Sequence, residues 1–440
     1  MRLLAVAITL VAAFTLAHAN PDGLVPSLSP PGNWQNAQGS ATDVFVYLDY
    51  DYEVDRANIM REHVGPGVDP NGGVPLEKDL VFHQYRHTIT PKIEIGLLHD
   101  TWIYAALPIV VNQARELRFD SGVDAMSSST VADGLVPAGG YDAQQPTTPP
   151  GGDLAFRGVD RHGLDQVHVG IGVAPMNQAR DDTKPTWKIG AEARIAVGKV
   201  MKFDPTAPGD NTAVGRGVHE LRLWTSFDRR LGWAEPWVEM FWQVPLGTNQ
   251  ASLFQDPGLG STNVQLQQLA GVNFGFEAYA IDDAVEHNRI SLDLGARAVA
   301  HFEGRDYSEM WEVFSYAGST SNPMNPLILD SDPITPGVQA MNHPGISNIE
   351  NYLETAVRVA VRAELGTHVK FAVLGDLMWK TDHVISFADA GVDRDGNDLV
   401  DPGTNEINPL HVDKIDLVGH RYHSVDNFGV VIGVQGLVTF

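Results

Sequence analysis

Segments of about ten to fifteen residues in which apolar side chains alternate with polar or small ones recur along most of the chain. Alternation at every second position predicts a β-strand whose two faces meet different surroundings. In the segment 289–303 the even-numbered positions are apolar, from Ile290 to Phe302, whereas the odd-numbered positions include Asp293, Arg297 and Glu303. The same pattern predicts strands in 186–200, 353–364 and 369–382.

The length of these segments favours strands that cross a membrane. A tilted transmembrane strand needs about 9 to 11 residues within the hydrocarbon, whereas strands of soluble sheets usually have about five or six. The last segment has an apolar residue or glycine at every second position from Phe428 to Phe440. An aromatic C-terminus after such a strand resembles the signal that the bacterial outer-membrane assembly machinery selects. The competing interpretation is a secreted soluble β-sandwich or propeller, which does not need so many long strands.

The links between the predicted strands alternate between short and long, as periplasmic turns and extracellular loops do in outer-membrane barrels. Short links are expected at 90–92, 180–185, 229–235, 282–287 and 365–368. Long links are expected at 56–79, 112–164, 201–217, 247–262, 304–350 and 388–426. These links separate about 12 strands, with the run 93–111 read as one bent strand or two. The expected fold class is therefore all-β: an antiparallel transmembrane β-barrel with both ends of its wall at the periplasmic side.

The N-terminus predicts export. Residues 1–19 contain Arg2, an apolar run from Leu3 to Leu16 and the small-x-small sequence Ala17-His18-Ala19, which together predict a cleaved signal peptide. A Pro- and Gly-rich periplasmic leader is expected over 20–42 and the barrel over 43–440. The chain has no cysteine, so neither a disulfide nor a lipoprotein anchor is expected. The expected location is the Gram-negative outer membrane.

Composition excludes some classes of protein. The chain has 30 Lys and Arg against 55 Asp and Glu, a formal net charge of -25. Nucleic acid binding is not expected, because it needs clustered cations. A mean hydropathy of -0.13 argues against a helical membrane protein. Acidic extracellular loops are expected to meet the divalent ions that bridge lipopolysaccharide.

Inside a barrel, the polar strand faces line the lumen. The residues expected to point inward are Asp49, Asp51, Glu53, Glu192, Arg194, Arg222, Asp293, Arg297, Arg358, Arg362, Lys370 and Lys380. Acids on the first strand opposite cations on the tenth and eleventh predict a transverse field across an open channel. In the alternative interpretation, the same charges pair into ladders that fill a closed lumen.

One loop carries oxygen ligands with the spacing of a calcium loop. Asp393, Asp395, Asn397 and Asp401 match positions one, three, five and nine of an EF-hand loop. Asp398 replaces the turn glycine and Thr404 stands in place of the bidentate Glu, for which Glu406 is the nearest substitute. A solvated acidic turn is the alternative. No sequence motif of a hydrolase, zinc protease or phosphate-binding loop is present, so enzymatic activity is not expected.

Three segments resemble bacterial barrels of the meta-pathway phenol-degradation type, a transporter-like group near the fatty-acid-transporter superfamily. They are 88–108, which ends in Ala-Leu-Pro, and the pair 186–198 and 215–246, in which Gly-rich strands alternate with short basic turns. The resemblance implies passage of small solutes, apolar or aromatic ones among them. We therefore expect passive or facilitated diffusion of small solutes without a cofactor. The alternative is a surface barrel, an adhesin or structural protein, whose loops bind a partner.

Overall fold

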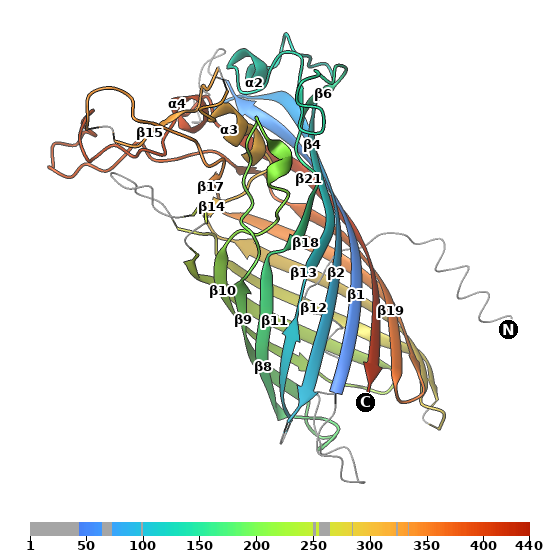
Figure 1. Cartoon of the computed structure of the whole chain (residues 1–440). Helices are drawn as coiled ribbons and strands as arrows, with labels where there is room; N and C mark the ends of the chain where they lie inside the picture. Colours follow the sequence, from blue (N-terminus) through green and yellow to red (C-terminus); the bar gives the residue numbers. More distant parts are fainter. Residues whose placement is uncertain are drawn as a thin grey trace.

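The chain forms a wall of antiparallel strands that closes on itself, shown in Figure 1 for a computed structural model. The structure describes residues 44–63, 73–97, 100–249, 252–254, 265–283, 285–322, 324–332 and 334–440. The expected signal peptide and leader lie outside these residues. In order around the ring, the wall contains β1 (Val44–Glu62), β2 (Leu76–Gly96), β3 (Thr101–Ala106) continued by β4 (Ile109–Phe119), β7 (Arg161–Leu164) continued by β8 (Gln166–Met176), β9 (Thr186–Ala196), β10 (Val218–Asp228), β11 (Ala234–Thr248), β12 (Leu269–Asp283), β13 (Asn288–His301), β18 (Tyr352–Leu365), β19 (Val369–Lys380) and β21 (Tyr422–Thr439).

Closure of the wall comes from pairing of the first strand with the last. β1 pairs with β21 along nearly its whole length, from Phe45 opposite Thr439 to Arg61 opposite Tyr422. Each wall strand also pairs with its neighbour in the ring, always antiparallel. The predicted antiparallel barrel of 12 strands is therefore confirmed.

The short link expected at 90–92 is wrong, because β2 runs straight through it. Pro91 lies opposite Leu48 of β1, and the Pro91 carbonyl oxygen accepts a hydrogen bond from the Leu107 amide at 3.0 Å. The side of Pro91 that lacks an N–H therefore faces residues 107–108, where the neighbouring strand is interrupted between β3 and β4. Proline is tolerated where the ladder is already broken. The turn follows Gly96 instead, so 93–111 contains the end of β2 and the start of the next strand.

The two faces of the wall have opposite character. The outward face is apolar: Leu48 is 58% exposed, Val357 51% and Phe371 44%. The inward face of the same strands carries charged side chains such as Asp49 and Asp376, which are buried. A closed barrel with an apolar outside belongs in lipid, because each strand pairs its backbone with two neighbours and no edge is left open. The chain is an outer-membrane β-barrel of a Gram-negative envelope.

The two ends of the barrel differ as the link lengths predict. In Figure 1 the C-terminus and the start of β1 lie at the end with the short links. The other short links follow Met176, Asp228, Asp283 and Leu365. Phe440 donates its amide to the Val44 carbonyl at 2.9 Å and remains 72% exposed, and its selection by the assembly machinery stays a prediction.

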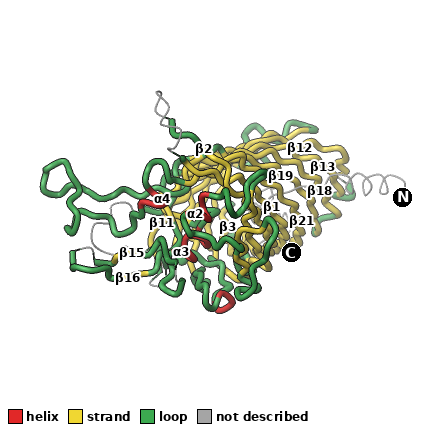
Figure 2. Tube along the Cα trace, turned by 90° about the horizontal axis from the view of Figure 1, so that it is seen from above, coloured by secondary structure: helices red, strands yellow, loops and turns green. Residues whose placement is uncertain are grey.

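The long links at the other end fold into a cap. Its elements are α2 (Ser129–Ala132), β5 (Tyr141–Asp142), β6 (Leu154–Arg157), the 3-10 helix η2 (Pro208–Asp210), β14 (Gly304–Asp306), α3 (Trp311–Ala317), β15 (Leu329–Asp330), β16 (Ala340–Met341), β17 (Ser347–Ile349), β20 (His383–Val384) and α4 (Asp413–Asp416). Seen from above, the loops around β15, β16 and α4 extend to one side of the barrel (Figure 2). No helix among the described residues is both long and apolar enough to cross a membrane.

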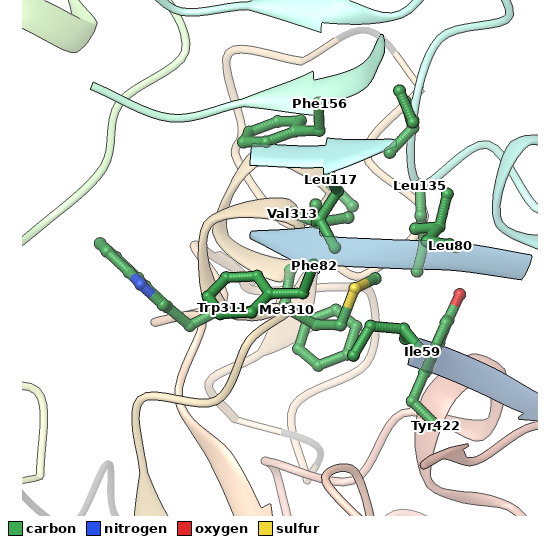
Figure 3. Close-up of a cluster of buried hydrophobic side chains, with 14 of the residues drawn as sticks. Ile59, Leu80, Phe82, Leu117, Leu135, Phe156, Met310, Trp311, Val313 and Tyr422 are labelled. Carbon is green, nitrogen blue, oxygen red and sulfur yellow. The ribbon is translucent and has the colours of Figure 1, made fainter. Parts of the chain in front are cut away.

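The main hydrophobic core joins this cap to the inside of the wall. Met310, Trp311 and Phe314 of the cap are fully buried and pack with Ile59 of β1 and Phe82 of β2 (Figure 3). Leu117 of β4 belongs to the same core, although 112–164 was expected to be one loop. At the end of the barrel that carries the cap, the inward face of β1, β2 and β4 is thus apolar, and α3 packs against it. The residues around α3, from Met310 to Ala317, therefore lie inside the end of the wall.

Candidate functional site

All twelve residues expected to point inward lie on the inward faces of their strands. Their positions have the same parity as buried residues such as Asp49 on β1, Glu192 on β9, Arg222 on β10, Asp293 on β13 and Asp376 on β19. The strand faces were therefore predicted correctly. That these side chains line a path for a solute stays a prediction. Their ion pairs and hydrogen bonds are relevant to it, because a side chain held by a partner is less available to a solute.

Most of the inward cations form direct ion pairs. Arg362 donates from Nη1 to Glu277 Oε2 at 2.9 Å and from Nη2 to Asp293 Oδ2 at 2.8 Å, which joins β18 to β12 and β13. Arg358 binds both oxygens of Asp376, at 2.8 and 2.7 Å. Similar pairs are Arg222 with Glu239, Arg297 with Glu354 and Arg194 with Glu192. We call these residues the ion-pair network.

The inward charges pair with near neighbours and do not form separate acidic and basic walls, which the expected transverse field would need. The basic wall of β18 and β19 is neutralised by acids on the same or the next strands: Arg358 by Asp376, Arg362 by Glu277 and Asp293, and Lys370 by Glu364. These three cations are thus compensated locally, as in the alternative interpretation with ladders of paired charges. Lys380 is the exception among the four cations of that wall, because no Asp or Glu oxygen of the described residues lies within 4.0 Å of its nitrogen.

Aromatic rings narrow another side of the lumen. Trp102 and Tyr104 of β3 are buried, and Trp224 of β10 donates from Nε1 to Tyr104 Oη at 3.2 Å. A Cβ at Gly170 or Gly172 of β8 would overlap the rings of Tyr104 and Trp102. Glycine is needed there because the rings lie flat against the wall.

Residues 307–317, which we call the plug, lie inside the end of the wall that carries the long links. Arg161 of β7 is fully buried and donates from Nη2 to Glu312 Oε1 at 2.7 Å, and its guanidinium carbon lies 4.8 Å from the Trp311 ring centre. A Cβ at Gly158 would overlap the Glu312 carboxylate, so this pair depends on a glycine beside it. The plug is therefore attached to the wall by a buried ion pair and a cation–π contact.

Further hydrogen bonds attach the plug to its surroundings. Tyr307 Oη donates to the Met201 carbonyl at 2.9 Å, and Arg115 Nη2 donates to the Ser308 carbonyl at 2.8 Å. Ser315 Oγ donates to the Phe203 carbonyl at 3.3 Å. These bonds join the plug to β4 and to the link between β9 and β10. With Arg161 of β7, three parts of the chain therefore position it.

Two large cavities lined by described residues lie inside the barrel, one toward each end. The outer chamber, of about 430 Å³, lies below the plug and is lined by its Tyr307 and Glu309 and by the extracellular ends of strands, including His301 and Lys380. The inner vestibule, of about 590 Å³, is lined by the periplasmic ends of strands, including Lys370. Along β13 and β19 the residues of the ion-pair network lie between those that line the two cavities.

The predicted calcium loop is partly assembled. The ligand oxygens of Asp393, Asp395 and Glu406 lie within 4.8 Å of one another, whereas Asp401 Oδ2 accepts a hydrogen bond from Asn397 Nδ2 at 3.1 Å. Asp398 adopts the positive φ of 65° that the turn glycine would supply. Backbone amides of Gly396 and Asp398 lower the pKa of Asp393. Calcium binding stays a prediction, which calorimetric titration of the protein and its Asp393→Asn variant would test.

Some residues of this site were missed from the sequence. Arg86 lies on β2, close to the turn that was expected at 90–92 although the strand continues to Gly96. Arg115 lies on β4, in the range 112–164 that was expected to be a loop. Extending the alternation of β2 past Pro91 would have placed Arg86 inward. The Arg161–Glu312 pair carries no local signal, because the two residues are 151 positions apart.

Comparison with known proteins finds no matching family model and no matching curated protein. Solved structures similar in arrangement include an outer-membrane channel from Pseudomonas putida F1, with 8% identity, TM-score 0.42 and coverage of 95% of this chain and 100% of that chain. A Pseudomonas aeruginosa FadL homologue has 8% identity, TM-score 0.32 and coverage of 91% and 90%. The outer membrane protease OmpT from Escherichia coli has 9% identity, TM-score 0.26 and coverage of 92% and 100%.

Proposed function

We propose that this barrel is an outer-membrane channel through which small solutes diffuse, by passive or facilitated diffusion, and that the plug closes its extracellular end. The observation that carries the proposal is the pair of cavities inside the wall, one at each end of the lumen. The plug belongs to a loop rather than to the wall, so it can move without breaking the barrel. Such a path needs no cofactor or energy coupling of its own.

Conductance and solute flux test this proposal. Glu312→Ala removes the partner of the buried Arg161, and breaking a buried pair costs about 3–5 kcal/mol. Because 1.4 kcal/mol is about a tenfold change in a population, we expect the open state to become at least about tenfold more populated. Planar-bilayer current and liposome flux should both rise in this variant. Glu116→Ala is the matched control, because Glu116 pairs with Arg118 on the partly exposed outer side of the wall.

A surface barrel without transport is the second candidate. The buried ion-pair network favours it, and so do apolar side chains exposed on the cap, such as Val338 at 67% and Leu399 at 64%. If neither the native protein nor Glu312→Ala passes current or solute, the channel proposal is wrong. A partner-binding barrel is then the better conclusion.

A further inference from the structure

We propose that the outer chamber is a binding site for a small oxyanion, a carboxylate or phosphate solute, held by Arg86, Arg115 and Lys380. This names the solute class of the proposed channel and therefore rests on that function. Binding can nevertheless be measured without transport, so the two proposals can fail separately.

The three cations share a property that sets them apart. Among the inward-facing Lys and Arg of the described wall strands, Arg86, Arg115 and Lys380 have no Asp or Glu oxygen within 4.0 Å. Inward cations elsewhere in the wall, such as Lys92, have such a partner. All three uncompensated cations line the same chamber. A cation enclosed in a protein is stable only when it is paired, hydrogen-bonded or hydrated.

Their hydrogen-bonding capacity is also incompletely used. The Nε atoms of Arg86 and Arg115 are buried and have no hydrogen-bond partner among the described residues. Arg115 donates a hydrogen bond to the Ser308 carbonyl of the plug, and its guanidinium carbon lies 5.0 Å from the Phe82 ring centre. Guanidinium groups bind carboxylate and phosphate oxygens through paired N–H donors, so a ligand oxyanion would supply acceptors that this chamber lacks.

The acids of the chamber do not neutralise these three cations directly. Asp165, Glu220 and Asp306 gather around Arg216, at 3.6, 3.0 and 3.4 Å. Asp55 and Glu309 also line the chamber, and neither lies within 4.0 Å of a Lys or Arg nitrogen among the described residues. The chamber therefore has one side on which Arg216 is directly paired, and one side on which Arg86, Arg115 and Lys380 interact with acids only at longer range. These acids are Glu53, Asp55, Glu309, Glu312 and Glu354.

The remaining lining suits a small organic solute. Tyr352 is stacked between His301 and His383, with ring centres 4.1 Å apart on each side, and the three rings form a wall beside Lys380. Phe82 and Ile349 add apolar surface. A volume of about 430 Å³ lies within the roughly 300–1,000 Å³ usual for small-molecule sites. The chamber can thus hold an oxyanion with a compact apolar body, such as an aromatic carboxylate.

Calorimetric titration of the purified full-length protein in detergent tests the proposal, with benzoate, inorganic phosphate and neutral benzamide as probes. We expect benzoate or phosphate to bind at least about tenfold more tightly than benzamide. Tighter binding of benzoate identifies an organic carboxylate as the ligand type, and tighter binding of phosphate identifies a phosphate. Equal binding of benzoate and benzamide with no binding of phosphate would overturn the proposal, as would the absence of binding by all three.

Variants locate the site. Lys380→Gln and Arg86→Gln should each weaken anion binding by about tenfold or more, whereas Lys380→Arg should retain it. Lys370→Gln is the matched control, because Lys370 lies on the same face of β19 but lines the vestibule and pairs with Glu364. If Lys380→Gln does not fold, Arg86→Gln and Lys380→Arg still decide the question. Loss of binding in Lys370→Gln together with retention in Arg86→Gln would contradict the assignment to the chamber. Anion binding without flux would support this site and count against the channel.

Discussion

The two cavities of the lumen are built on the same strands but treat their cations differently. In the vestibule, Lys370 lies 3.1 Å from Glu364, and Arg289 lies 2.9 Å from Asp282. In the outer chamber, ten residues along the same face of β19, Lys380 has no acidic partner within 4.0 Å among the described residues. The vestibule cations thus support the wall, whereas those of the chamber remain available to a ligand. The difference indicates that an inward charge can serve structure or binding, depending on its neighbours.

The largest expected effect is a difference in unfolding free energy between removal of a cation with a direct acidic partner and removal of a cation without one. Arg362→Ala leaves Glu277 and Asp293 buried without their partner, and we expect a loss of about 3–5 kcal/mol of unfolding free energy. Arg86→Ala removes no ion pair and should cost less than about 1 kcal/mol. Urea unfolding in lipid vesicles measures both. Equal losses would remove the distinction between the two kinds of cation.

The next effect concerns the plug that covers the chamber. Gly158→Ala places a methyl group where the Glu312 carboxylate lies, and forcing extra volume into a packed site costs about 1–3 kcal/mol. We expect faster hydrogen exchange in residues 307–317, with the exchange of β18 and β19 unchanged. Gly247→Ala, on β11 where an added Cβ would meet no atom within 4 Å and φ is not positive, is a control for substitution of a glycine. Unchanged exchange in the plug would show that the pair does not hold it.

A pH effect is expected in the cap above the chamber. Burial raises the pKa of the Asp416 carboxyl to about 7, against about 3.9 in an unfolded chain. Between these values the folded segment keeps a proton that the unfolded one has lost, so local stability falls as pH rises from about 4 to about 7 and then levels off. Hydrogen exchange of residues 409–421, corrected for intrinsic rates, should show this slope. Asp416→Asn should abolish it, and a slope that persists would assign the effect to another group.

The smallest expected effect compares the two lysines of β19. Lys370→Gln removes a partly exposed ion pair, which is worth about 0–1 kcal/mol, whereas Lys380→Gln removes none. Urea unfolding of both variants should therefore show a small loss for Lys370→Gln and none for Lys380→Gln. A larger loss for Lys380→Gln would mean that Asp55 or Glu309 compensates Lys380 after all.

Much of the fold followed from the alternation of side chains. The wall of twelve strands, its lipid-facing side and the inward direction of Asp293, Arg358 and Lys380 were all predicted, because each depends only on a period of two along the strand. The link at 90–92 was wrong because Pro91 was read as the end of a strand. Proline has no N–H to donate, but at this position the neighbouring strand is interrupted, so β2 can continue through it. Arg115 was missed for a related reason, since β4 was assigned to a loop.

The sequence by itself determined which side chains face lipid and which face the lumen, because a bilayer imposes that choice on each strand separately. Only the tertiary structure decided which cation meets which acid and that residues 307–317 lie inside the end of the wall. Ion pairs such as Arg362 with Glu277 depend on the register between strands, and the Arg161–Glu312 pair joins residues 151 positions apart. Neither relation is present in the local pattern, because both arise from closing the barrel and folding its loops inward.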